Sequence, residues 1–332
     1  MSLSAPASLR LSGTVEAATR EAPMPRVGFI VGPTGTGKTA LAIAVAERLG
    51  AEIVNADSRQ FYHGMDLGTA KPTPAERRHV THHLIDIRNP DEPLDVAEFA
   101  QLAQAAIASV AERGRPVLVV GGSGLYLRVL RDGIFAGPPA VPGLRADLTA
   151  YARQHGTPAL HAELVAVDPD AAARIGPNDL IRMVRALEVF RITGVPISAH
   201  QARHRFASSP YTSLTVGITL PRERLYAVID RRFVAMIAAG LLAEVRALLN
   251  AGTGGAALAA TIGYRELAAH LRGEIDLPTA IGQAQRASRQ LAKRQLTWFR
   301  ADPSIIWLDA RTAFAPAMEL LRDFFAPKST DG

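Results

Sequence analysis

The residues Gly32-Pro33-Thr34-Gly35-Thr36-Gly37-Lys38-Thr39 are the most informative local pattern in this 332-residue chain. It fits the pattern of Gly, four residues, Gly, Lys and then Ser or Thr, which is typical of a phosphate-binding P-loop. The apolar run Val27-Gly28-Phe29-Ile30-Val31 before it predicts a buried parallel strand, and the alanine- and leucine-rich residues after it, to about Leu49, predict a helix. Because the pattern lies between a strand and a helix, we favour a phosphate site over a glycine-rich turn that matches by chance.

The residue types of this loop explain how it would bind phosphate. Glycines let consecutive backbone N–H groups curl around phosphate oxygens, because no Cβ is in the way. The positive end of the following helix and the charge of Lys38 add to the attraction. The hydroxyl of Thr39 is the expected ligand of a Mg²⁺ cofactor bound with the phosphates.

Outward from the loop, apolar runs alternate with helical patterns. Further strands are expected over 51–55, 84–87, 116–120, 214–220 and 305–308, and helices over 96–113, 223–250 and 281–300. This alternation predicts an α/β fold, a P-loop NTPase-like parallel sheet flanked by helices.

One part of the chain lacks strand patterns and predicts an inserted all-helical subdomain. The expected division is a flexible N-terminal extension (1–24), a P-loop core (25–135 and 208–312), a helical insertion (136–207) and a C-terminal helix and tail (313–332).

Composition narrows the possible functions. Lys and Arg number 37 against 31 Asp and Glu, which gives a net charge of +6 and a pI near 9.9. This charge fits a nucleic-acid partner, or else a mildly basic solvated surface. The absence of cysteine excludes disulfides, thiolate zinc sites and a cysteine nucleophile. No apolar run approaches the ~18 residues that span a bilayer, so we expect a cytoplasmic protein without a membrane partner.

A P-loop alone does not specify the reaction. An NTPase usually ends an apolar strand with an acid, but the run at 116–120 leads into Gly121-Gly122-Ser123. Asp57 or Asp86 could substitute, which leaves a nucleotide-hydrolysing or phosphoryl-transferring enzyme open at this point.

Several further motifs, in this order, carry a family resemblance. They are Asp57-Ser58-Arg59-Gln60-Phe61-Tyr62, Gly64-Met65-Asp66-Leu67-Gly68-Thr69-Ala70-Lys71-Pro72, His82-His83-Leu84-Ile85-Asp86, Gly121-Gly122-Ser123-Gly124-Leu125-Tyr126, Pro177-Asn178-Asp179, Arg185-Ala186-Leu187-Glu188, Gly263-Tyr264-Arg265 and Lys293-Arg294-Gln295-Leu296-Thr297-Trp298. With the P-loop they resemble the tRNA dimethylallyltransferases of bacterial type, over about residues 27–309.

The resemblance implies transfer of a dimethylallyl group from dimethylallyl diphosphate to N6 of adenine 37, beside the anticodon, with release of pyrophosphate. The partner would be the anticodon stem-loop of tRNA, and the enzyme a monomer. The residues Gly32, Pro33, Thr34, Gly35, Thr36, Gly37, Lys38 and Thr39 would then bind a diphosphate that leaves.

The same resemblance assigns catalytic roles. Asp57 would be the general base, and the alternative is a helix cap or an indirect magnesium ligand. Ser123, where the family often has Thr, would contact the leaving oxygen or cap a helix. Lys38 and Arg232 would neutralise the pyrophosphate, unless Arg232 is a solvated charge. Val228 stands where the family has a further arginine.

The arrangement of cations on the predicted helix 281–300 indicates an RNA-binding surface. At about 100° per residue, four of them share a sector roughly 60° wide: Arg286, Arg289, Lys293 and Arg300. The alternative is a solvated helix face. Arg294 lies off this stripe, and Trp298 and Phe299 are expected in the core.

The remaining tRNA contacts rest on the resemblance. They are Asp57, Ser58, Arg59, Gln60, Arg145, Ile181, Arg182, Met183, Val184, Arg185, Gly263, Tyr264, Arg265, Arg294 and Gln295. Gln60 is expected to read an adenine edge with paired hydrogen bonds. His82 and His83 are interpreted as structural.

Two other functions are compatible with the P-loop. A small-molecule or nucleotide kinase would explain Lys38 and Thr39 but not the basic stripe or the insertion. A nucleic-acid-binding regulatory ATPase would bind RNA in a salt-dependent way without modifying it.

Overall fold

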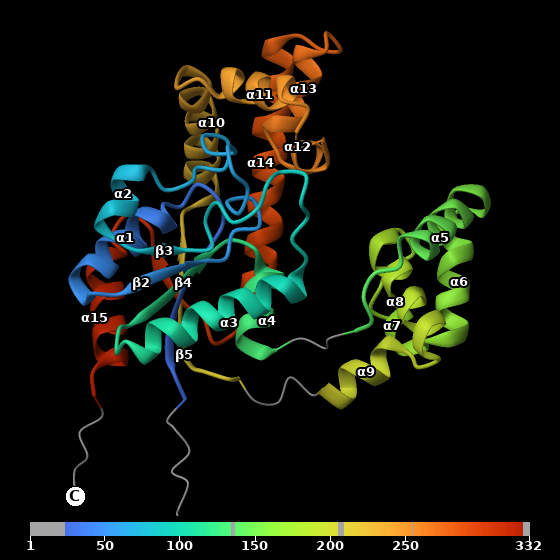
Figure 1. Ribbon diagram of the computed structural model, residues 1–332, viewed down its shortest axis with the longest axis horizontal. Coiled ribbons are helices and arrows are strands. Elements are labelled where there is room, and N and C mark those ends of the chain that lie inside the picture. The colour runs from blue at the N-terminus through green and yellow to red at the C-terminus, as the bar shows by residue number, and fades with distance from the viewer. Residues whose placement is uncertain (1–23, 134–136, 205–208, 254, 328–332) are drawn as a thin grey trace, which may run out of the picture.

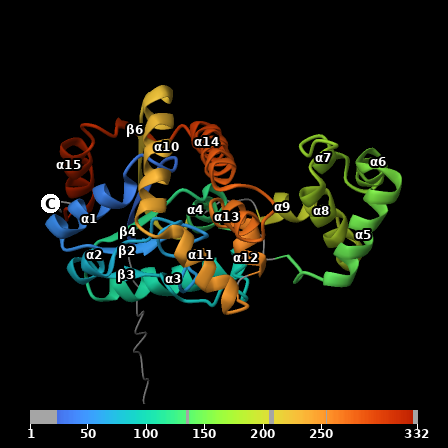
Figure 2. The ribbon, with the colours of Figure 1, turned by 90° about the horizontal axis from the view of Figure 1, so that it is seen from above.

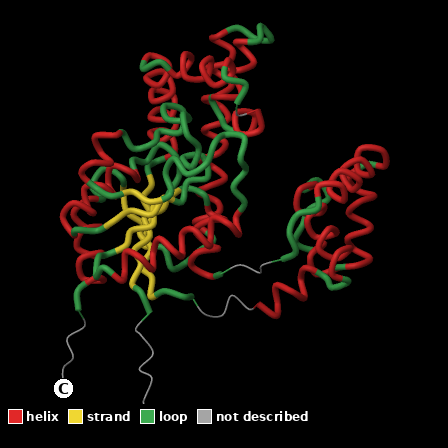
Figure 3. The backbone as a smooth tube through the Cα atoms, viewed as in Figure 1, coloured by secondary structure: helices red, strands yellow, loops and turns green. Residues whose placement is uncertain are grey.

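Six parallel strands form one sheet, in the order β3-β2-β4-β1-β5-β6, in the computed structural model of the chain (Figures 1 and 3). The structure describes residues 24–133, 137–204, 209–253 and 255–327. The strands are β1 (Arg26–Val31), β2 (Glu52–Asn55), β3 (His82–His83), β4 (Val117–Gly121), β5 (Thr212–Thr219) and β6 (Ile306–Asp309). The predicted parallel α/β sheet is confirmed. Residues 1–23 of the expected extension and 328–332 of the expected tail lie outside the described residues.

The third strand is where the sequence prediction was wrong. It covers His82–His83 and not 84–87. Leu84 and Asp86 have φ values of 61° and 54°, in the left-handed region that an extended strand does not use. The chain turns there and runs beside the segment after β2, because the N–H of Ile87 donates to the Phe61 carbonyl at 2.8 Å.

Helices cover both faces of the sheet. Alternation along β1 sends Val27, Phe29 and Val31 into one apolar core and Ile30 into the other. The first core is closed by α3 (Val96–Glu112) and α4 (Gly124–Asp132), and the second by α1 (Lys38–Leu49) and α15 (Phe314–Phe325). The short α2 (Pro74–His79) precedes β3.

Five helices form a third core beyond the carboxyl ends of the strands (Figure 1). They are α10 (Arg222–Ala238), α11 (Leu241–Asn250), α12 (Gly255–Ala260), α13 (Tyr264–Leu271) and α14 (Leu277–Arg300). The single helix predicted over 223–250 is broken at Gly240, whose φ of 107° favours glycine. Helix α14 begins four residues before the predicted 281, because the Asp276 side chain accepts from the Thr279 N–H and caps it.

Within the described ranges, no single helix has the length and apolarity needed to cross a membrane. The helices α10 and α11 have that length and apolarity only when they are taken together, and the pair is bent by 61°.

The helices of residues 137–204 lie to one side of the sheet in both ribbon views (Figures 1 and 2). They are α5 (Pro142–His155), α6 (Thr157–Val167), α7 (Pro169–Ala172), α8 (Leu180–Thr193) and α9 (Ile197–His204). Leu148, Leu160, Leu164 and Met183 fill an apolar core of their own. These helices therefore have a core separate from that of the sheet.

Candidate functional site

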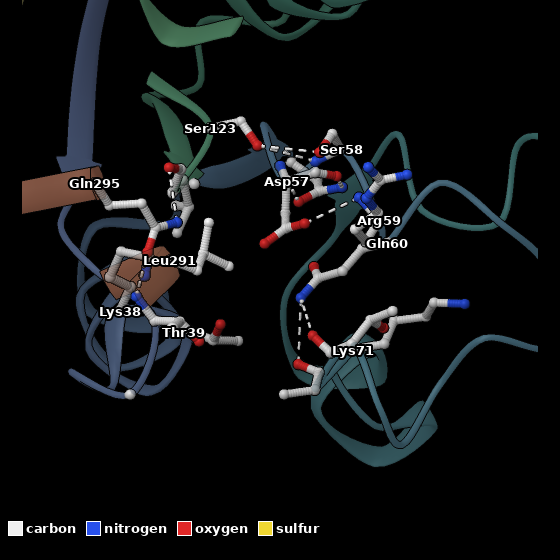
Figure 4. Close-up of a pocket in the computed structure, with 18 of the residues that line it drawn as sticks. Lys38, Thr39, Asp57, Ser58, Arg59, Gln60, Lys71, Ser123, Leu291 and Gln295 are labelled. Carbon is white, nitrogen blue, oxygen red and sulfur yellow. Dashed lines mark hydrogen bonds between the residues drawn. The ribbon is translucent and has the colours of Figure 1, made fainter. Parts of the chain in front are cut away.

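The P-loop opens into a pocket of about 930 Å³ at the carboxyl ends of the strands. In parallel α/β sheets, this edge is where ligands bind. The pocket is lined by the P-loop, by the segments after β2 and β4, and by α14. Figure 4 shows Lys38 and Thr39 on one side of it, and Asp57, Ser58 and Gln60 on the other.

The loop backbone takes the shape that its glycines permit. Gly32 has a φ of 146°, and a Cβ there would lie 2.3 Å from the Ile218 carbonyl oxygen. Gly37, with a φ of 82°, directly precedes α1. A side chain at Gly32 would therefore collide with β5, which explains the residue type in physical terms.

Two cations lie against the P-loop. Lys38 Nζ donates to the Pro33 carbonyl at 2.8 Å, and Arg232 Nη2 donates to Thr34 Oγ1 at 2.6 Å. Burial lowers the pKa of Lys38 to about 8, against an opposing attraction from Asp57. Burial also lowers the pKa of Arg232. Arg232 thus lies against the P-loop, and the alternative of a solvated charge is wrong.

Asp57 uses one carboxylate oxygen for a local turn. Its Oδ1 accepts from the Arg59 N–H at 2.9 Å, while its own N–H donates to Asn55 Oδ1 at 3.0 Å. The carboxylate faces the pocket in Figure 4. The local turn and a contact with a ligand are therefore compatible, since the second oxygen is not used by the turn.

Ser123 occupies the residue before α4, but its hydroxyl does not cap that helix. Its Oγ instead accepts from the Ser58 N–H at 3.2 Å and lies 3.3 Å from Ser58 Oγ. The proposed helix cap is therefore wrong, and the hydroxyl joins the segment after β4 to the segment after β2.

Gln295, predicted to contact tRNA, holds the P-loop. Its Oε1 accepts from the Thr34 N–H at 2.8 Å, and its Nε2 donates to the Gly122 carbonyl at 2.9 Å. A Cβ at Gly122 would lie 2.5 Å from that nitrogen, so the glycine is required for the contact. The sequence contains no local signal for this role, because the partners are 261 and 173 residues away.

Gln60 is buried and lines the pocket. Its Nε2 donates to the carbonyls of Thr69 and Ala70 at 3.1 and 3.2 Å. Both amide hydrogens are therefore engaged, and the predicted pair of hydrogen bonds to an adenine edge is not available. The neighbouring Ser58 and Arg59 line the same pocket.

The basic stripe of α14 is only partly free. Arg286, Lys293 and Arg300 are exposed, but Arg289 forms an ion pair with Asp230 at 2.5 Å. One cation of the stripe is therefore paired with a carboxylate, which comes from α10. Arg294, placed off the stripe, lines the pocket.

Trp298 does not lie in the core, where it was predicted. Phe299 is buried as expected, but Trp298 is 37% exposed. Its ring packs on Gly124, where a Cβ would lie 2.3 Å away. It borders both the pocket and a second cavity of about 1080 Å³, which is also lined by Arg182, Lys293 and Arg294.

In the insertion, the predicted tRNA segment has two kinds of residue. Met183 and Val184 are buried in the helical core, so their side chains pack inside it and do not face a ligand. Ile181 is 84% exposed. Arg182 is exposed and lies 3.4 Å from Asp179.

Arg145 and Arg185 share one buried carboxylate. Arg145 donates to both oxygens of Glu188 at 2.8 and 2.9 Å, and Arg185 Nη1 donates at 2.6 Å. Burial raises the pKa of Glu188, but these bonds outweigh it and hold the pKa below its usual value. Glu188 therefore orients both guanidinium groups.

The Gly263-Tyr264-Arg265 motif is mainly structural. Tyr264 is fully buried and its hydroxyl donates to Glu244. The Gly263 N–H donates to Glu266 Oε2 at 2.7 Å at the start of α13. Arg265 pairs with Glu266 and lines the pocket. A direct RNA contact by the Tyr264 side chain is therefore not available in this structure.

The residues fit a magnesium ion bound with phosphates. Within the described ranges, no group of three or more His, Cys, Asp or Glu side chains could hold a metal. Thr39 lines the pocket beside Lys38. Mg²⁺ commonly has one or two protein ligands and completes its shell with phosphate and water oxygens, so Thr39 suits it.

The fold and the pocket define a P-loop enzyme whose P-loop faces a carboxylate and two hydroxyl groups across one pocket. The family model described as IPP transferase matches residues 60–302. The chain belongs to this family.

Relatives and solved structures agree with this assignment. The chain is 49% identical to the tRNA dimethylallyltransferase of Geobacter metallireducens, over 90% of this chain and 97% of the relative. It is 50% identical to that of Syntrophobacter fumaroxidans, over 90% and 87%. The Bacillus halodurans tRNA isopentenylpyrophosphate transferase structure has a TM-score of 0.68 at 37% identity, over 91% and 97%. A eukaryotic dimethylallyltransferase acting on tRNA has a TM-score of 0.76 at 25% identity, over 90% and 80%. The comparisons do not favour the kinase alternative.

Proposed function

We propose that this enzyme transfers a dimethylallyl group from dimethylallyl diphosphate to N6 of adenine 37 in tRNA and releases pyrophosphate. The observation that carries the proposal is the single pocket in which Lys38 and the P-loop face Asp57 and Ser123. An anionic donor would bind on one side and a nucleobase on the other. Membership of the IPP transferase family supports the same reaction.

At the donor side, the protein supplies charge and N–H donors to the diphosphate. Lys38 and Arg232 lie at the P-loop, where they would neutralise negative charge that grows as the carbon–oxygen bond breaks. Thr39 would hold a Mg²⁺ ion, which when bound supplies further neutralisation of the pyrophosphate. Gln295 keeps the Thr34 backbone in place for this task.

At the acceptor side, N6 forms a bond to the allylic carbon as that carbon leaves the diphosphate. The amine is a weak nucleophile until alkylation begins, and it then becomes acidic. The free oxygen of Asp57 takes its proton, so adenine is neutral again after the transfer. Ser123 holds the Ser58 segment and would offer its hydroxyl to the leaving oxygen.

The RNA would approach from the side of the second cavity. Its wall includes cations from the insertion and from α14, namely Arg182, Lys293 and Arg294, beside the exposed ring of Trp298. Phosphates of an anticodon stem-loop would bind the cations. The target base must leave its stack, which costs a few kcal/mol, and contacts with the aromatic ring and phosphates would offset that cost. We propose that a cytoplasmic monomer carries out the reaction.

A transfer assay tests the proposal. Purified enzyme, dimethylallyl diphosphate, Mg²⁺ and unmodified tRNA are incubated, and nucleosides are analysed by mass spectrometry. The expected product is adenosine heavier by one prenyl group, from position 37. Enzyme that binds tRNA but gives no such product across a broad tRNA pool would refute the proposed function.

A further inference from the structure

Loop 64–72 lies beside the acceptor side of the pocket and supports Gln60 through its backbone. The Gln60 amide nitrogen donates one hydrogen to Thr69 O and the other to Ala70 O. Carbonyl oxygens only accept hydrogen bonds, so they fix which end of the amide faces them. The Gln60 oxygen is left for a ligand, and it can only accept.

A buried lysine fixes the end of the loop that carries these two carbonyls. The Lys71 side chain is 1% exposed and points away from the pocket (Figure 4). Its Nζ donates to the Tyr62 carbonyl at 2.7 Å and to the carboxylates of Asp66 and Asp86 at 2.5 and 2.6 Å. Three donors thus meet three acceptors, which ties together the segment after Gln60, loop 64–72 and the turn after β3.

The backbone beside Lys71 is held in a costly conformation. Ala70 has a φ of 52°, a region that non-glycine residues rarely adopt. Its N–H donates to the Leu67 carbonyl at 3.1 Å, and the Lys71 N–H donates to the Asp66 carbonyl at 3.1 Å. This conformation persists only when the surroundings determine it, and the contacts of the buried Lys71 ammonium group are part of those surroundings.

Glu244 on α11 anchors the other part of the loop. Its carboxylate accepts from the N–H groups of Asp66 and Leu67 at 3.2 and 2.9 Å and from the Tyr264 hydroxyl. Gly68 packs against the Tyr264 ring, from which a Cβ would be only 2.4 Å away. Both ends of the loop are therefore fixed, and so are the carbonyls that orient Gln60.

We propose that Lys71 is a positioning residue that fixes Gln60 as a pure hydrogen-bond acceptor, so that the site selects a base carrying an amine. This inference rests on the proposed function, because it assumes that a nucleobase occupies the acceptor side. An exocyclic amine has two hydrogens, one for Asp57 and one for the Gln60 oxygen. A base without that amine leaves the Gln60 oxygen unpaired in a pocket, which is costly.

Two RNA hairpins that differ only at the target base test the proposal. One carries adenine and the other purine, which lacks the 6-amino group, and their affinities are measured by competition without donor. The wild-type protein is expected to prefer adenine by roughly tenfold, the scale of one lost hydrogen bond in a buried site. Gln60→Met and Lys71→Met are both expected to reduce that preference at least threefold, although Lys71 touches no ligand.

Arg77→Met is the matched control. Arg77 Nη1 donates to the other oxygen of Asp86 at 2.7 Å, so the variant removes an ion pair of the same cluster without reaching the Thr69 and Ala70 carbonyls. It is expected to keep the wild-type preference. A general loss of stability would lower both affinities equally in either variant, so the ratio separates positioning from folding.

A folded Lys71→Met protein with the wild-type ratio, or a Gln60→Met protein with that ratio, would overturn the inference. If Lys71→Met does not fold, Lys71→Gln is measured in its place. This variant keeps two N–H donors, so its ratio of adenine to purine affinity is expected to lie between those of the wild-type and Gln60→Met proteins. Failure of the proposed function is distinguishable. In that case the wild-type protein would not prenylate the adenine hairpin when donor is supplied.

Discussion

Replacing Gln295 by leucine separates a donor-side role from an RNA-side role for this residue. The variant keeps the size of the side chain but removes the acceptor for the Thr34 N–H and the donor to the Gly122 carbonyl, at 2.8 and 2.9 Å. Both bonds involve part-buried backbone groups, and each is worth about 1–1.5 kcal/mol. A total of about 2–3 kcal/mol corresponds to a 30- to 150-fold loss, at 1.4 kcal/mol per factor of ten.

The assay is steady-state prenyl transfer with each substrate varied in turn, together with RNA affinity measured without donor. We expect kcat/KM for dimethylallyl diphosphate to fall by about 30- to 150-fold while RNA affinity changes less than threefold. Gln283→Leu makes the same substitution at an exposed position of α14 and serves as the control. A loss below threefold in kcat/KM, or an equal loss of RNA affinity, would refute the reasoning.

Three other predictions concern separate parts of the site. Asp57→Ala is expected to keep RNA affinity and slow transfer at least ~100-fold, the scale of a lost general base, and near-normal turnover in single-turnover kinetics would contradict this. Neutralising Lys293 and Arg294 together is expected to weaken RNA binding and lower the slope of log affinity against log salt by about two, whereas an unchanged slope would assign them to the solvated surface. The lowered pKa of Lys38, about 8, predicts that donor affinity falls as pH rises through that value, because the ammonium loses its charge. Between that pH and the usual lysine pKa the unfolded chain binds the extra proton, so the unfolding free energy should rise with pH while donor affinity falls. Parallel calorimetry and thermal unfolding check the two opposite trends.

Local patterns in the sequence predicted the sheet and the P-loop well. The central strands β1 and β4 are short apolar runs, and the loop depends on glycines and a lysine that lie close together in the chain. The third strand was misplaced because Leu84 and Ile85 are apolar. In the structure Leu84 has a left-handed φ, and the residues after it hydrogen-bond to the backbone of Gln60 and Phe61, which are distant in the chain. Helix 223–250 was predicted unbroken because Gly240 is surrounded by good helix formers.

Site residues were predicted less well where their partners are remote. Arg289 was assigned to an RNA surface, but its carboxylate partner Asp230 is 59 residues away. Trp298 was assigned to the core together with Phe299, yet Gly124 leaves the ring room at the edge of the pocket. Met183 and Val184 were taken from a motif, and a motif does not say which of its side chains face inward.

Helix α14 has a consequence for how the two substrates influence each other. Gln295 fixes the P-loop, while Lys293 and Arg294, adjacent on the same helix, line the cavity where RNA would bind. A displacement of the helix by RNA would therefore move the Thr34 backbone as well. The two binding free energies are then coupled, and thermodynamic reciprocity requires that an occupied P-loop change RNA affinity by the same factor. Occupation of the P-loop would then be seen as a changed RNA affinity, and bound RNA as an equally changed donor affinity.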